Sequence, residues 1–368
     1  MSGFSGFSGF SGFSGFSGFS GFSGFNGAGV SGALTDLTIS EGINSARARM
    51  HIKSDTPTYA PKYPKKINVP ADIKTVEKLH RMQTCLAELQ STIQFGTQGA
   101  NTAFINHIQL DSANNTGKFA SFNIATITRP SSNQLFIEQL ELVKLQAVKA
   151  KRQDCMNEIL SQLTPALPYF AALAGMQPNQ HKWTFELLEL TIAFASSNCM
   201  RFKEAFQCPR PVEYSPDVMP IIPTPEHCTL PSGHSTESFA ISHTLRALFD
   251  AAKVKNPAIN AHLIAMAQQV AQNRTVAGLH FPVDSAVGCA LGTSTADYFV
   301  QRCTGKGGWE SRTFECDKFV LPGGPRDFSA EEVLFTKQAY LQACQEGQSL
   351  PGGYLMPQMW AWAVAEWA

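Results

Sequence analysis

Three short segments in the second half of the chain carry cationic side chains, histidines and a carboxylate beside Gly or Pro. The segments read KEAFQCPRP, PSGH and NRTVAGLHFPVD. Their chemically capable residues are Lys203, Arg210, His234, Arg274, His280 and Asp284. Lysine and arginine bind anionic oxygens through charge-assisted hydrogen bonds, and the guanidinium fork suits a tetrahedral oxyanion. Histidine can act as a nucleophile or transfer protons near neutral pH. Together the segments predict a site for phosphate or an anion of the same shape.

The PSGH segment begins a predicted helix over residues 233–252. Helix starts present unpaired backbone N–H groups and the positive end of the helix dipole, which attract anions. Ser232 and Gly233 would present such groups, and His234 beside them could act as the general acid or base. Each segment alone also fits a structural role, such as a solvated helix end, a turn with an N-cap, or a cation at a helix C-terminus. The anion-site interpretation depends on all three segments occurring together.

The order and spacing of the three segments resemble a known tripartite motif. Lys203 and Arg210 are separated by six residues, PSGH follows, and His280 lies six residues after Arg274 and four before Asp284. This pattern is similar to that of the type 2 phosphatidic acid phosphatases and the vanadium-dependent haloperoxidases. The resemblance covers about residues 182–301, which it implies to be the catalytic core.

The resemblance implies a role for each matching residue. His280 would be the nucleophile of a phosphatase or the ligand of vanadate in a haloperoxidase, Asp284 would orient it, and His234 would be the general acid or base. The oxygens of the anion would be held by Lys203, Arg210, Arg274 and the backbone N–H groups of Ser232 and Gly233. The chain departs from the family pattern at Asn273, where Ser is usual, but Asn can still donate a hydrogen bond.

The motif does not separate haloperoxidase from phosphatase. The long helical region before the core resembles the haloperoxidase layout, and His227 resembles a histidine that bromoperoxidases place beside vanadate, although it could equally be a loop histidine. Against the haloperoxidase, Met200 stands three residues before Lys203, where some chloroperoxidases carry Trp. The helical region and His227 nevertheless favour, as the leading interpretation, a haloperoxidase that holds vanadate and uses peroxide to oxidise halide, with bromide as the expected halide. The alternative is a soluble acid phosphatase that needs no cofactor and hydrolyses phosphomonoesters through a phospho-His280 intermediate.

The first residues suggest a third, non-catalytic interpretation. Eight Ser-Gly-Phe repeats follow Met1, and a period of three matches neither a helix nor a strand. Residues 1–35 are therefore expected to be a disordered tail, and residues 36–71 a basic, proline-containing linker. Regularly spaced Phe residues could support self-association, so the chain could also be a scaffold that works through this tail. A homo-oligomer is left open as well.

Residues 72–368 are expected to form one mostly all-α domain, a helical bundle of the type that the resemblance implies, with additional N-terminal helices. Apolar spacing predicts helices over about 134–163, 182–206, 260–276, 283–301 and 330–345, whereas residues 100–130 are polar and less regular. A net charge of zero argues against a nucleic-acid partner. The absence of a long apolar run and of a signal-like start predicts a cytoplasmic protein with no membrane span, and the absence of C-x-x-C pairs fits free thiols in a reducing compartment. The expected substrates are small molecules, either halide and peroxide or a phosphomonoester.

Overall fold

The computed structural model describes residues 45, 74, 76–110, 119–256, 258–346, 350 and 353–368. The predicted tail over residues 1–35 lies outside the described residues, and so does the predicted linker over 36–71 apart from Ser45. Contacts divide the chain into two units, and the fold and site presented below lie in the unit that contains Met82–Ala368.

Four long helices form the core, and their bounds lie close to the predicted ranges. They are α7 (Lys182–Phe206), α9 (Gly233–Ala252), α10 (Ile259–Val276) and α11 (Pro282–Thr304). Helix α9 packs against the other three, and residues 283–296 of α11 are all buried. The remaining helices are α3 (Lys78–Gln90), α4 (Gln134–Gln146), α5 (Lys149–Ser161), α6 (Leu167–Ala174), α8 (Pro211–Tyr214), α12 (Ala330–Phe335) and α13 (Met356–Ala365). Of the helices in the described part of the chain, none combines the length and apolar character of a membrane span.

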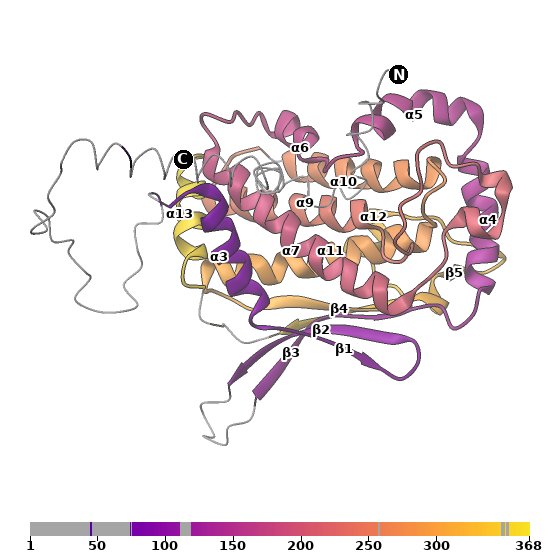
Figure 1. Ribbon diagram of the computed structural model, residues 1–368, viewed down its shortest axis with the longest axis horizontal. Coiled ribbons are helices and arrows are strands. Elements are labelled where there is room, and N and C mark those ends of the chain that lie inside the picture. The colour runs from indigo at the N-terminus through magenta and orange to yellow at the C-terminus, as the bar shows by residue number, and fades with distance from the viewer. Residues whose placement is uncertain are drawn as a thin grey trace, which may run out of the picture. The chain divides into compact units, whose positions relative to one another are not determined.

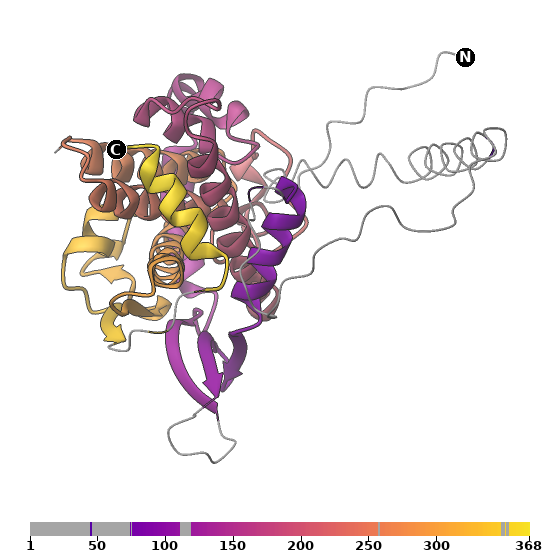
Figure 2. The ribbon, with the colours of Figure 1, turned by 90° about the vertical axis from the view of Figure 1, so that its left-hand side faces the viewer.

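The prediction of a mostly all-α fold is wrong, because a five-stranded mixed sheet lies along one side of the helices (Figures 1 and 2). Its strand order is β1-β2-β3-β4-β7. The strands are β1 (Ile93–Gln98), β2 (Thr102–Leu110), β3 (Phe119–Thr128), β4 (Trp309–Glu315) and β7 (Leu341–Glu346). Strands β3 and β4 pair in parallel, and the other neighbours pair antiparallel. Strands β3 and β4 pack on α11 and β2 packs on α7, so the sheet covers the helices that hold the site.

The strands escaped prediction because their alternation is weakly apolar. In β2 the buried positions are Ala103, Ile105 and His107, of which one is small and one is polar. The ring of His107 is accommodated because its Nδ1 lies 2.8 Å from the hydroxyl of Tyr298 on α11. Burial lowers the pKa of His107 to about 4, so this side chain behaves as a neutral core residue.

Two of the predicted helices are also corrected. The helix expected over 134–163 is broken at Val148, whose backbone is extended, so that α4 packs on α8 and β6 (Gly324–Pro325) while α5 packs on α10. The helix expected over 330–345 ends at Phe335, and the chain then enters β7. In both cases tertiary packing overrides the local helical pattern.

Close packing of α9 on α11 depends on Gly292. A Cβ atom at this position would overlap the backbone carbonyl of Thr236, which belongs to α9 and cannot move as a flexible side chain would. We expect Gly292→Ala to lower the free energy of unfolding by about 1–3 kcal/mol, the usual cost of overpacking. Urea denaturation checks this, with Gly324→Ala as the control, because the space around Gly324 is open. Equal stability of the two variants would contradict the packing argument.

Candidate active site

The predicted site residues lie at the ends of five helices. Lys203 is in the last turn of α7, and Arg210 precedes α8, where its backbone N–H donates to Glu213 Oε1 at 2.7 Å. Ser232 is the N-cap of α9, and Arg274 is in the last turn of α10. His280 lies just before α11, with Asp284 in the first turn of that helix. Helix ends leave backbone groups unpaired, which explains why this region can bind polar side chains and ions.

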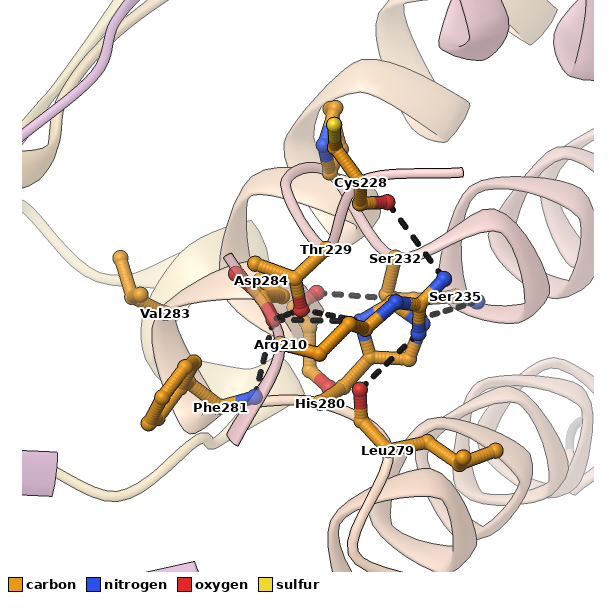
Figure 3. A network of polar contacts seen from close by, with 12 residues as sticks. Arg210, Cys228, Thr229, Ser232, Ser235, Leu279, His280, Phe281, Val283 and Asp284 are labelled. Atoms are coloured by element: carbon orange, nitrogen blue, oxygen red, sulfur yellow. Dashed lines mark hydrogen bonds and ion pairs between the residues drawn. The ribbon is translucent and has the colours of Figure 1, made fainter. Parts of the chain in front are cut away.

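His280 is held in one tautomer by two neighbours (Figure 3). Its Nε2 lies 3.2 Å from a terminal nitrogen of Arg210, and an arginine can only donate, so Nε2 must accept. Its Nδ1 lies 3.1 Å from Asp284 Oδ2 and therefore carries the proton. Burial, followed by the nearby Arg210 and Lys203, lowers the pKa of His280 well below its usual value. The imidazole is thus neutral, and its Nε2 lone pair faces the cations.

Asp284 receives three hydrogen bonds on one oxygen. Besides His280, the donors to Oδ2 are the backbone N–H of Phe281 at 2.8 Å and the hydroxyl of Thr229. Burial raises the pKa of Asp284 to about 6, although these donors and the cations act in the opposite direction. The carboxylate is therefore charged at neutral pH and fixed in place. Thr229 is a site residue that the sequence analysis missed, since a threonine three residues before Ser232 gives no distinctive signal.

Lys203 and Arg210 are both buried and bind the loop before α9. The Nζ of Lys203 donates to the carbonyls of Cys228 at 2.7 Å and Thr229 at 2.9 Å. An ammonium group has three donors, so one remains for another acceptor. The guanidinium of Arg210 contacts the carbonyls of His227 and Leu279 in addition to His280. Burial lowers the pKa of Lys203 to about 8 and that of Arg210 to about 10, so holding these charges without an anion is costly.

Arg274 has donors that lack acceptors. Its side chain is fully buried, and one terminal nitrogen donates to Gln162 Oε1 at 2.9 Å and the Ile159 carbonyl at 3.3 Å. Its Nε and other terminal nitrogen have no hydrogen-bond partner among the described residues. Burial lowers the pKa of Arg274 to about 10. Because buried polar groups are nearly always hydrogen-bonded, these nitrogens indicate a missing acceptor.

His234 is also held in one tautomer. Its Nε2 lies 2.7 Å from the backbone carbonyl of Gln162, and a carbonyl only accepts, so Nε2 carries the proton. Nδ1 is then the ring nitrogen free to take or give a proton. Burial lowers the pKa of His234 to about 3, with further contributions from Arg274, Lys203 and Arg210. The three cations therefore all act electrostatically on this histidine.

The backbone N–H of Ser232 and the side chain of Asn273, both expected to donate to the anion, donate to other protein groups. The backbone N–H of Ser232 donates to the Asp284 carbonyl at 3.0 Å, so it ties α9 to α11, and the Ser232 hydroxyl caps the helix by accepting from Ser235 N. The Asn273 side chain, expected to face the anion, donates to Glu158 Oε2 and Gln162 Oε1. Gly233 is the first residue of α9, and the position that its Cβ would occupy is open to 4 Å among the described atoms.

His227 lies against Arg210. Its Nδ1 is 3.0 Å from a terminal nitrogen of that arginine, which makes the ring an acceptor. Burial, followed by Lys203 and Arg210, lowers the pKa of His227 to about 4. The structure thus places His227 at the site, half-buried and neutral, beside a predicted anion-binding side chain.

The buried charges of the site are unbalanced. Lys203, Arg210 and Arg274 are buried here, whereas the buried carboxylates are those of Asp284 and Glu237, and burial raises the pKa of Glu237 to about 7. A bound dianion would remove the excess positive charge and accept from the unpartnered nitrogens. The arrangement can therefore hold a tetrahedral oxyanion with its central atom near a neutral imidazole nitrogen.

Comparison with known families matches residues 186–305 to the model described as PAP2 superfamily. The matched region contains all the predicted site residues, but not Gln162. A search of curated proteins finds no match to this chain.

Proposed function

Residues 186–305 belong to the PAP2 superfamily, and from that premise we propose that the chain is a vanadate-dependent haloperoxidase that uses peroxide to oxidise halide, bromide in the first place. The observation that carries the oxyanion site is the set of unpartnered, fully buried nitrogens of Arg274. These nitrogens indicate that an acceptor with several oxygens binds beside the imidazoles of His234 and His280.

The residues present fit vanadate. His280 Nε2 is unprotonated, as a ligand must be, and Asp284 holds the ring through the opposite nitrogen. The side chains of Lys203, Arg210 and Arg274 would offset the charge of the oxyanion. Vanadate would supply a Lewis-acid centre that activates peroxide toward attack by halide.

Proton transfer falls to His234 in this proposal. Because its Nε2–H is given to the Gln162 carbonyl, Nδ1 must be the atom that exchanges a proton with the bound oxygens or with peroxide. A bound dianion opposes the neighbouring cations and so favours protonation of Nδ1. His227 adds a second neutral imidazole beside Arg210, which supports bromide oxidation by analogy with the bromoperoxidase resemblance.

Phosphomonoester hydrolysis is the second candidate, and the neutral His280 supports it, because its unprotonated Nε2 can act as a nucleophile once Arg210, which donates to it here, donates to the bound anion instead. Attack by Nε2 on phosphorus would form a nitrogen–phosphorus bond and break the bond to the leaving oxygen, which takes a proton from His234. Water, giving its proton back to His234, would then attack phosphorus and release phosphate and free His280. This reaction needs no added group.

Two assays on one purified sample separate the candidates. We expect vanadate-loaded protein to brominate an organic acceptor in the presence of bromide and hydrogen peroxide well above the rate of free vanadate. Added phosphate should inhibit, because both anions compete for one set of donors. Hydrolysis of a generic phosphomonoester without added metal is measured in parallel.

The outcomes are distinct. Bromination at the level of free vanadate, together with robust phosphomonoester hydrolysis that vanadate inhibits, would overturn the haloperoxidase proposal in favour of the phosphatase. Absence of both activities, with no change in melting temperature on adding phosphate or vanadate, would overturn the oxyanion site itself.

A further inference from the structure

We propose that Gln162 is an additional residue of the oxyanion site, donating its side-chain amide to the bound anion and positioning Arg274. The inference rests on the proposed function and extends it to a residue that precedes the family match over 186–305. Gln162 follows directly after α5 and is fully buried. The sequence pattern marks it only as one more polar residue near the end of a predicted helix.

The orientation of the Gln162 amide follows from its neighbours. A terminal nitrogen of Arg274 and Nδ2 of Asn273 approach the same atom at 2.9 and 3.1 Å. Both groups donate, so that atom must be the oxygen Oε1. The amide nitrogen Nε2 is then fixed on the other side, buried and without a partner among the described residues. A buried NH₂ group in this position indicates a missing acceptor.

The unpartnered donors belong to Gln162 and Arg274, whose side chains are hydrogen-bonded to each other. Arg274 contributes Nε and one terminal nitrogen, and Gln162 contributes Nε2. One multi-oxygen anion could satisfy all of them, whereas no described side chain does. This makes Gln162 a donor to the anion through Nε2 and a positioning residue through Oε1.

The same residue also reaches the proton-transfer histidine. The backbone carbonyl of Gln162 accepts from His234 Nε2 at 2.7 Å. Gln162 therefore contacts the second motif segment through its backbone and the third through its side chain. A structural packing residue does not need hydrogen bonds to both.

Helix α5 is anchored firmly enough to hold Gln162 in register. The Gln162 backbone N–H donates to the Glu158 carbonyl at 2.9 Å. Arg152 on the same helix donates to the carbonyls of Val276 at 3.1 Å and Val218 at 2.8 Å. Ile159 packs in one buried cluster with residues of the α10–α11 loop. The segment before the family match is thus built into the site.

The test measures phosphate affinity by calorimetry for the full-length wild type, Gln162→Met and Gln162→Glu. Met removes both the donor and the acceptor, and we expect phosphate to bind about ten- to a hundredfold more weakly, the usual effect of losing a hydrogen bond to a charged group. Glu keeps an oxygen for Arg274 and Asn273 but turns a second oxygen toward the anion, so it should also weaken binding. Gln301→Met is the matched control, because Gln301 is also buried and donates to the Leu350 carbonyl. Gln301 lies near the C-terminal end of α11, whereas His280 and Asp284 lie at the opposite end of that helix.

Melting temperatures without added anion provide a second readout. Gln162→Glu should melt above Gln162→Met, since the carboxylate still accepts from Arg274 and Asn273. Unchanged phosphate affinity in Gln162→Met, with only its melting temperature lowered, would show a merely structural residue and overturn the donor role. If the wild type binds no phosphate, the proposed function and the donor role both fail, and the melting order alone decides the positioning role: Met at or above Glu would overturn it as well.

Discussion

Replacing His280 with alanine is expected to abolish turnover in both assays, by about 10⁴-fold or more. The variant removes the one imidazole whose Nε2 faces Arg210 while its Nδ1 is held by Asp284. In the haloperoxidase this nitrogen anchors vanadate, and in the phosphatase it forms the bond to phosphorus. No water molecule in the same place can supply an equally oriented nucleophile or ligand.

The matched control is His243→Ala. His243 Nε2 lies 3.1 Å from Asp297 Oδ1, so this is a second histidine–aspartate pair, placed between α9 and α11 outside the site. We expect His243→Ala to keep wild-type turnover, and His280→Ala to retain measurable phosphate binding through the donors of Arg274. Near-normal turnover in His280→Ala would show that the assigned nucleophile or ligand is wrong.

The helices that carry the site could be predicted because their sequence signals are local. Apolar spacing and the flanking Gly and Pro residues place α7, α9, α10 and α11 within a few residues of their observed bounds. The motif residues sit at the ends of these helices, so the same signals indicated where the functional side chains would lie. The family assignment follows from them and is confirmed by the match over 186–305.

The sheet could not be predicted in the same way. Strand β3 pairs in parallel with β4, with Ala125 opposite Arg312, and nothing local in either segment indicates a partner so far along the chain. The buried face of β2 includes His107, which is tolerated only because Tyr298 on α11 receives it. Strand formation here depends on tertiary packing, which the pattern of residues along a single sequence does not reveal.

The contacts inside the site were predictable only in part. Spacing indicated that His280 and Asp284 pair, since residues four apart at a helix start can meet. It did not indicate that the Ser232 N–H would bind the Asp284 carbonyl, nor that Thr229 and Gln162 would join the site. These contacts form between segments that are distant in sequence, and Thr and Gln are too common to be distinctive.

Asp284→Asn is expected to lower turnover by about 10³–10⁴-fold while leaving the fold intact, as the loss of a carboxylate behind a catalytic histidine typically does. Oδ2 accepts from Phe281 N–H, the Thr229 hydroxyl and His280 Nδ1–H at once. Because three donors meet at Oδ2, the amide oxygen of Asn would take that place, and its NH₂ would take the place of Oδ1, which has no partner among the described residues. The His280 tautomer is then kept, and the variant loses the negative charge that stabilises the ring when its Nε2 bonds to phosphorus or vanadium.

The role of the Asp284 charge can be tested through the pH dependence of kcat/KM, because the direction of the change is defined. Burial raises the pKa of Asp284 to about 6, so its negative charge is lost as pH falls below that value, and with it the advantage of the wild type over the variant. His234 and His227, whose pKa values burial lowers to about 3 and about 4, gain protons in the same direction in both proteins, so their effect cancels in a ratio of the two. Asp284→Asn cannot titrate there, so the ratio of wild-type to variant kcat/KM should decline below about pH 6, and titration of the substrate cancels in that ratio. Asp297→Asn, which alters the pair with His243, serves as the control and should keep the wild-type profile. A constant ratio across this range would show that Asp284 does not act on turnover through its charge.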